Sequence, residues 1–279
     1  MLYGGCDLGV VSAKAAIIDD NGPLAFEILP YSSFPQEAAI AVMEKALGRA
    51  GLAGKRMDRY VSTGFGGKAV PHSDGVAPDT ICLQRAVRRL NPKVRTVINV
   101  GGHSFMAFYI DTTGGLGESA MTDFCTAGMG MLLEAISTAL EVPLDELIRE
   151  SGSPDRPLYI NNQCPVFAES EAISLINEGY DRGDVFAGIV SAVATKIAGQ
   201  VRRLGAVQEV AMVGGVRKNR LVMANLEKNL NLSFADLGGM DPQVVGAYGA
   251  ALLAREGCSL DSQSLSTTVA ERLHREGKP

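Results

Sequence analysis

The chain of 279 residues has a hydrophobic content of 46%, a charged content of 20% and a net charge of −5. These values describe a globular protein long enough for two domains, and they favour neither a nucleic-acid nor a membrane partner. Five cysteines, at positions 6, 82, 125, 164 and 258, are odd in number and widely scattered. That spacing argues against a disulfide framework. Since we also expect no signal peptide and no membrane-spanning run, the sequence predicts a cytoplasmic protein.

The first third of the chain has the pattern of a β-meander followed by helices. The turn from Asp20 to Pro23 joins two strand-like runs, as in a hairpin. Pro35 stands at a position typical of a first helical turn. We expect strands at 2–7, 14–19, 24–29 and 60–63, and helices at 36–50 and 79–90.

The same pattern restarts at Val94. A buried strand ends in Gly101 and Gly102, and a hairpin partner follows it. We expect strands at 94–100, 104–110 and 208–213, and helices near 126–140, 143–151, 166–178, 184–204, 217–229 and 243–256. The repetition predicts a duplicated α/β fold with a first lobe at 1–92, joined by the helix at 243–256, a second lobe at 93–242 and a polar tail at 257–279.

Small-residue turns follow three of the predicted strands. Glycine at such a turn lets backbone N–H groups close on a phosphate, and an aspartate beside it can hold hydrated Mg²⁺. Each turn alone also fits an ordinary structural turn, and the chain contains no Walker A or dinucleotide fingerprint. Together they predict a nucleotide cleft between the two lobes. The turns are Asp7-Leu8-Gly9, Asn99-Val100-Gly101-Gly102 and Val213-Gly214-Gly215-Val216.

Two cysteines each stand just before an apolar run at helical spacing. A thiol at a helix N-terminus is exposed to the helix dipole and to free N–H groups, which favour a thiolate or an anionic inorganic group. Cys125 and Cys164 are half of the four thiolates that a cubane iron–sulfur cluster takes. The hypothesis is a cluster shared by two chains. The alternative is that both thiols are small buried hydrophobes, as we expect for Cys6 and Cys82.

The two cysteine motifs resemble those of one known family. Residues 125–130, Cys-Thr-Ala-Gly-Met-Gly, resemble its Cys-Ala-Ala-Gly-Thr-Gly, and residues 164–171, Cys-Pro-Val-Phe-Ala-Glu-Ser-Glu, resemble its Cys-Thr-Val-Phe-Ala-Glu-Ser-Glu. From about residue 3 to 255 the chain is similar to the activator proteins of 2-hydroxyacyl-CoA dehydratases and the ATPase subunits of benzoyl-CoA reductase. These proteins belong to the acetate kinase, sugar kinase and actin superfamily.

The resemblance implies a two-lobed, actin-like (ribonuclease H-like) ATPase fold and an ATP-dependent electron donor. By resemblance, Cys125 and Cys164 bind a [4Fe-4S] cluster shared by two subunits, and Asp7 is the acid on the Mg²⁺ side of bound ATP or ADP. The implied partners are a second copy or a paralogue, a downstream reductase or dehydratase of acyl-CoA-type substrates, and an upstream ferredoxin or flavodoxin. The residues that the resemblance places at the bound groups are Gly9, Ser12, Lys14, Gly101, Gly102, Gly128, Gly130, Gly214, Gly215 and Asn219.

The sequence departs from the family at the loops that should hold the phosphates. Val10 and Val11 replace the Ser-Thr hydroxyls of the first loop. The second loop has Asn99 and His103 where the family has aspartate and glutamine, so these two are candidate catalytic residues. Nucleotide binding remains expected because backbone amides can still bind phosphate. Hydrolysis at a useful rate stays open.

Three functions follow from these features. The first is an ATP-binding [4Fe-4S] activator that delivers low-potential electrons to a reductase or dehydratase. The second is a non-hydrolysing subunit that completes the cluster of an active paralogue. The third is a small-molecule kinase of the same superfamily, which leaves the cysteine motifs unexplained and predicts an aspartate where Asn99 stands.

Overall fold

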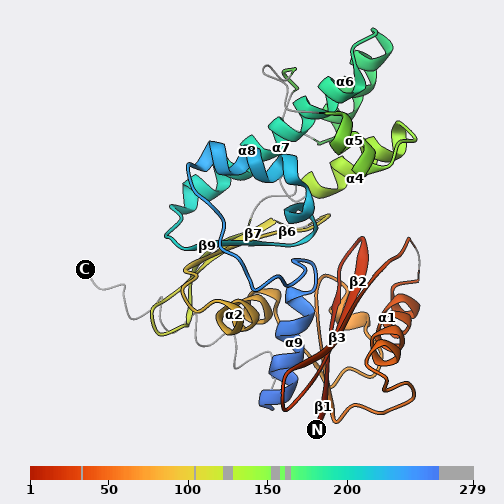
Figure 1. Cartoon of the computed structure of the whole chain (residues 1–279), viewed down its shortest axis with the longest axis vertical. Helices are drawn as coiled ribbons and strands as arrows, with labels where there is room; N and C mark the ends of the chain where they lie inside the picture. Colours follow the sequence, from red (N-terminus) through yellow and green to blue (C-terminus); the bar gives the residue numbers. More distant parts are fainter. Residues whose placement is uncertain (33, 104, 122–127, 152–157, 161–164, 258–279) are drawn as a thin grey trace. The chain divides into compact units, whose positions relative to one another are not determined.

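The computed structural model describes residues 1–32, 34–103, 105–121, 128–151, 158–160 and 165–257 (Figure 1). Contacts within the chain define two compact units. Unit 1 holds residues 1–8 and 12–82 and the chain from Gly246, and unit 2 holds residues 9–11 and 83–245. The division falls inside two helices, after Cys82 in Asp79–Leu90 and after Val245 in Val245–Glu256, so each contributes residues to both units.

Unit 1 is built on a five-stranded sheet with the order β3-β2-β1-β4-β5. The central strand β1 runs antiparallel to β2 and parallel to β4, so that Asp7 lies beside Lys14 on one side and Thr63 on the other. This register places a carboxylate, an ammonium and a hydroxyl side by side at one end of the strand. The strands are β1 (Leu2–Leu8), β2 (Ser12–Asp19), β3 (Pro23–Pro30), β4 (Arg59–Thr63) and β5 (Gly75–Val76).

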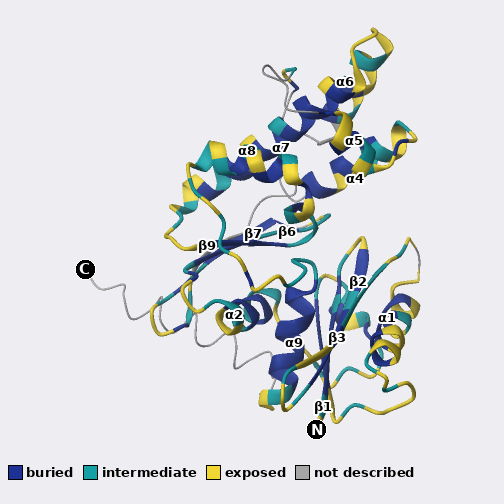
Figure 2. Ribbon diagram, viewed as in Figure 1, coloured by how far each residue is buried: buried dark blue, intermediate teal, exposed yellow. Residues whose placement is uncertain are grey.

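Helices enclose the sheet of unit 1 in an apolar core. Pro35 occupies the first helical turn of α1, as predicted, and the helix buries Ala39, Val42 and Ala46 with the side chains of β1 and β2. In Figure 2 the ribbon of α9 (Val245–Glu256) has the colour of buried residues over most of its length. The helices are α1 (Pro35–Arg49), α2 (Asp79–Leu90) and α9 (Val245–Glu256), with a short 3-10 turn, η1, at Gly67–Ala69.

Unit 2 is built on a four-stranded sheet with the order β8-β7-β6-β9. Strand β6 runs antiparallel to β7 and parallel to β9, with Asn99 opposite Val213. Parallel neighbours end at the same edge, so the turns after β6 and β9 lie together. The strands are β6 (Thr96–Val100), β7 (Phe105–Ile110), β8 (Leu116–Met121) and β9 (Val210–Val213), and the helices are α4 (Met129–Ala139), α5 (Leu144–Glu150), α6 (Pro165–Asn177), α7 (Arg182–Leu204) and α8 (Arg220–Leu230).

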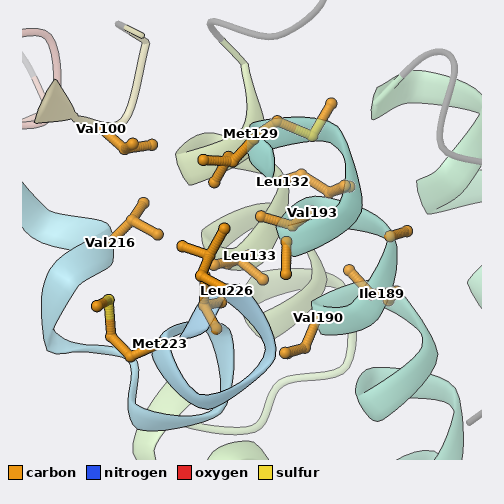
Figure 3. Close-up of a cluster of buried hydrophobic side chains, with 14 of the residues drawn as sticks. Val100, Met129, Leu132, Leu133, Ile189, Val190, Val193, Val216, Met223 and Leu226 are labelled. Atoms are coloured by element: carbon orange, nitrogen blue, oxygen red, sulfur yellow. The ribbon is translucent and has the colours of Figure 1, made fainter. Parts of the chain in front are cut away.

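The core of unit 2 is centred on α7, the longest helix that the structure describes. Side chains from α4, α7, α8 and the sheet meet there, as the labelled residues of Figure 3 show. By length and hydropathy α7 could cross a membrane, contrary to our expectation that no segment could. However, 67% of its apolar window is buried inside the protein, and burial in a core requires the same composition.

The C-terminal part of unit 2 corrects one prediction. We expected a single helix near 217–229, whereas the structure has a 3-10 turn, η2, at Gly215–Lys218 followed by α8 from Arg220. The cause is Asn219, whose side-chain oxygen accepts hydrogen bonds from the backbone N–H groups of Leu221 and Val222. An asparagine that caps a helix in this way ends the preceding turn and begins a new helix.

Candidate functional site

Asp7 is a half-buried acid near the end of β1 in unit 1. The Lys14 ammonium lies 3.7 Å from its Oδ2 atom and also donates to the Ser12 carbonyl at 3.1 Å. Burial raises the pKa of Asp7 above its ordinary value, the charge of Lys14 opposes that shift, and the neighbouring Asp79 carboxylate adds to it. A group that is costly to ionise in the free protein gains from a divalent cation nearby. Asp7 therefore has the chemistry expected of a Mg²⁺-side acid.

The turn after β4 closes around the same carboxylate. Gly64 has a φ of +90°, and a Cβ atom there would lie 2.5 Å from Asp7 Oδ1. Asp79 holds this turn, because its Oδ1 accepts hydrogen bonds from Thr63 Oγ1 and from the Gly64 N–H, both at 2.7 Å. Sequence reasoning missed this support. The helix starting at residue 79 was predicted, but nothing in the sequence brings Asp79 or Gly64 to Asp7.

The first loop of the chain groups with unit 2. Its two valines are 39% (Val10) and 38% (Val11) exposed, and the Val11 side chain packs on Gly102 so closely that a Cβ there would overlap it. Gly9 belongs to the same segment. Residues 9–11 therefore belong to the same unit as the Gly101-Gly102 turn. The side chains of Val10 and Val11 place apolar methyl groups where the family resemblance implies hydroxyls.

The second loop is joined to the start of α4. Gly130 lies against the Gly101 carbonyl oxygen, and a Cβ atom at Gly130 would lie 2.9 Å from Gly102 Cα. The Met131 N–H donates to the Gly102 carbonyl at 2.9 Å. Gly128 is the half-buried N-cap residue of this helix. The predicted residues Gly101, Gly102, Gly128 and Gly130 thus belong to one local structure.

The third loop meets the second at the sheet edge. A Cβ atom on Gly214 would lie 2.7 Å from the Asn99 Oδ1 atom, so the Asn99 carboxamide faces this turn. Gly215 lies beside Gln243, whose Oε1 accepts a hydrogen bond from Lys218 Nζ. His103 is exposed on the second loop, while Ser12 is buried in β2 of unit 1.

Asn219 carries an unused donor at this third loop. The residue is 4% exposed, and its oxygen caps α8. Its Nδ2 atom, however, is buried and has no hydrogen-bond partner within the described part of the chain. A buried amide donor without an acceptor is costly, which makes Asn219 a candidate residue for a ligand that offers an acceptor.

The two predicted cluster ligands, Cys125 and Cys164, lie outside the described residues. The helices that follow them in sequence, α4 and α6, pack against each other. Among the described residues no group of three or more His, Cys, Asp or Glu side chains could hold a metal ion. Cys6 and Cys82 are fully buried, which confirms that they are core residues, and burial raises the pKa of the Cys6 thiol to about 12.

Known proteins are similar to this chain in sequence and in fold. The activator of lactoyl-CoA dehydratase from Anaerotignum propionicum is 34% identical over 256 residues, which cover 90% of this chain and 96% of that protein. The solved structure of the activator of the 2-hydroxyisocaproyl-CoA dehydratase from Clostridium difficile, with bound ADPNP, is 30% identical, has a TM-score of 0.84 and covers 100% of this chain and 99% of that chain.

The fold also extends to a distant group. A ROK family glucokinase from Streptomyces griseus, solved with glucose and AMPPNP, has a TM-score of 0.54 at 14% identity over 92% of this chain and 100% of its own. At that identity the likeness concerns the fold alone, and it confirms the predicted actin-like α/β class. Residues 5–254 match the BadF/BadG/BcrA/BcrD ATPase family along almost the whole described chain. The chain is therefore a member of the BadF/BadG/BcrA/BcrD ATPase family.

Proposed function

We propose that the chain is an ATP-dependent activator that passes low-potential electrons to a partner reductase or dehydratase of acyl-CoA-type substrates. The observation that carries the proposal is the pair of cysteine motifs at residues 125–130 and 164–171 in a chain of this ATPase family. The names of its relatives support the activator role, since the similar proteins include activators of lactoyl-CoA and 2-hydroxyisocaproyl-CoA dehydratases.

Nucleotide binding is the better supported half of the proposal. Asp7 would hold Mg²⁺ through water, with Lys14 limiting the charge that the carboxylate presents. The amides of the Gly101-Gly102 turn would bind phosphate, and the unpartnered Asn219 Nδ2 would donate to the nucleoside. Asp7 lies near the end of β1 and the Gly101-Gly102 turn follows β6, and strand ends are where open α/β folds bind ligands.

The cluster is the second half. Cys125 and Cys164 would supply two thiolates, and a two-fold axis in a homodimer, or a pseudo-two-fold axis in a heterodimer, would supply two more. When bound, a [4Fe-4S] group supplies a one-electron couple whose potential responds to hydrogen bonds and solvent exposure. The packing of α4 on α6 supports this assignment, because it joins the two helices that the cysteines precede. A ferredoxin or flavodoxin would reduce the dimer.

Potentiometric titration of the anaerobically iron-loaded chain tests the activator function. The midpoint potential is expected to differ by about 60 mV or more between the nucleotide-free and the MgADPNP-bound chain, which is tenfold in equilibrium constant for one electron. Equal potentials with nucleotide demonstrably bound would argue against an ATP-driven electron donor.

A second function is favoured by the apolar first loop. Val11 packs on Gly102, Val10 offers no hydroxyl, and Asn99 cannot act as an acid, so the chain could bind ATP without hydrolysing it and pair with an active paralogue. Turnover of MgATP by the purified homodimer discriminates the two functions. Brisk hydrolysis selects the autonomous activator, and tight binding without hydrolysis selects the paired subunit.

A further inference from the structure

Helix α4 begins without a side-chain cap. Its N-cap position is Gly128, which offers no side-chain acceptor. The first N–H groups of any α-helix have no acceptor within the helix and need one from elsewhere. For Met131, in the first turn, that acceptor is the Gly102 carbonyl at 2.9 Å. The second loop thus supplies part of the cap of α4.

Close packing fixes the same contact. A Cβ atom on Gly130 would press into the Gly101 carbonyl and lie 2.9 Å from both the Gly101 carbonyl carbon and Gly102 Cα. All of these are backbone atoms, which cannot rotate away as a side chain can. Next to Gly130, Met129 is 2% exposed and lies in the same core as Val100 (Figure 3). The loop and the first turn of the helix are therefore packed backbone to backbone.

Side chains also pack on Gly102. The Val11 side chain packs on it, and Met131 Cγ would lie 3.7 Å from a Cβ there. Because a peptide unit is planar, the Gly102 carbonyl and the N–H of residue 103 turn together. Turning that N–H toward a phosphate would turn the carbonyl and change its hydrogen bond to Met131.

We propose that Gly102 and Gly130 are positioning residues that couple phosphate binding at the second loop to the first turn of α4, the helix that follows Cys125. This inference rests on the proposed nucleotide site. It gives the loop a second role besides binding phosphate, since the same peptide that meets the anion also caps the helix.

Hydrogen–deuterium exchange of the wild-type chain with and without MgADPNP tests the coupling without any variant. Exchange within residues 129–133 is expected to change about fivefold, the effect of gaining or losing one net hydrogen bond. Exchange within α5, which takes no part in the contact between the second loop and α4, should stay the same. A response confined to residues 99–103, with α4 unchanged, would overturn the inference.

Two alanine variants sharpen the test. Gly130→Ala forces the loop and helix apart, so α4 should exchange faster without nucleotide and lose its response to MgADPNP. Gly199→Ala, also within a helix of unit 2, is the matched control because nothing lies within 4 Å of its Cβ position. It should respond as the wild type does. A Gly130→Ala chain that keeps the wild-type response would contradict the coupling.

Binding of a fluorescent ATP analogue, measured in parallel, separates the two claims. No binding by the wild type would defeat the proposed function and the coupling with it. Binding with an unresponsive α4 would defeat the coupling alone.

Discussion

The Lys14 ammonium lies 3.7 Å from Asp7 Oδ2, directly across the antiparallel pair of β1 and β2. The two side chains are 12% and 21% exposed, so the pair is shielded from most of the solvent. An ion pair at this distance is loose enough to admit water or a cation on the carboxylate. Because of this ion pair, the ionisation of Asp7 is the property of the candidate site that is simplest to measure.

Asp7 should give the chain a specific pH dependence. Burial raises its pKa, so the folded state holds the proton more tightly than the unfolded state does. The contribution of Asp7 to stability should therefore fall as pH rises from 3.8, the ordinary value, to the raised folded pKa, and then stay level. Urea unfolding across this window should show Asp7→Asn gaining stability relative to the wild type.

Asp111 provides the opposite control. Hydrogen bonds from the Thr113 hydroxyl and from the Gly115 N–H lower the pKa of its carboxyl. Asp111→Asn should therefore lose stability relative to the wild type as pH rises. A difference for Asp7→Asn that does not depend on pH would contradict the role of burial at Asp7.

The turn at Gly64 should be intolerant of a side chain. Gly64→Ala must adopt a φ of +90° and place a Cβ atom 2.5 Å from Asp7 Oδ1. Backbone strain costs about 1–2 kcal/mol, and overpacking adds about 1–3 kcal/mol. Gly54→Ala is the matched control, with a φ of +74° and open space around it, and should show only the first cost. Equal losses of unfolding free energy for Gly64→Ala and Gly54→Ala, measured in urea, would mean that the turn does not press on Asp7.

The first loop offers a gain-of-function prediction. Val11→Thr keeps the side-chain shape and adds a hydroxyl at a position that is 38% exposed. If the loop faces phosphate, the new donor should tighten MgATP binding about tenfold, as a hydrogen bond to a charged group does. Calorimetry measures this. Val207→Thr, at an exposed valine of the same unit, should leave the affinity unchanged.

Two substitutions at Asn219 should distinguish its role as a helix cap from its role in ligand binding. Asn219→Ala removes the cap of α8 and should cost about 1 kcal/mol of unfolding free energy. Asn219→Asp keeps the acceptor for Leu221 and Val222 but lacks the Nδ2 donor, so it should fold well and bind nucleotide more weakly. Asp181→Ala, at the cap of α7, should lower stability without altering nucleotide affinity. Undiminished binding by Asn219→Asp would remove Asn219 from the site.

Much of the fold was predictable because its signals are local. The helix at 79–90 was predicted with the bounds that the structure has, since an acidic residue begins it and Asn91-Pro92 ends it. Strand β5 was missed because two residues, Gly75 and Val76, carry no alternation and depend on pairing with β4. The break at Asn219 was missed because a side-chain cap competes with a continuous apolar pattern.

The site was predictable as a set of turns but not as an arrangement. Sequence reasoning singled out Gly101, Gly102 and Gly130 but did not predict how they are joined. The hydrogen bond from the Met131 N–H to the Gly102 carbonyl connects segments that a hairpin separates in the sequence. The support of Gly64 by Asp79 is equally non-local. Such contacts arise from strand order and register, which periodicity alone does not determine.

The iron content of the reconstituted protein tests the central claim most directly. After incubation with iron and sulfide under argon, the wild-type homodimer should hold about four irons, and Cys125→Ala and Cys164→Ala should each hold almost none. Cys82→Ala, at a fully buried core thiol, should retain the wild-type content. Full iron retention by either the Cys125→Ala or the Cys164→Ala variant would contradict a cluster shared through these two cysteines.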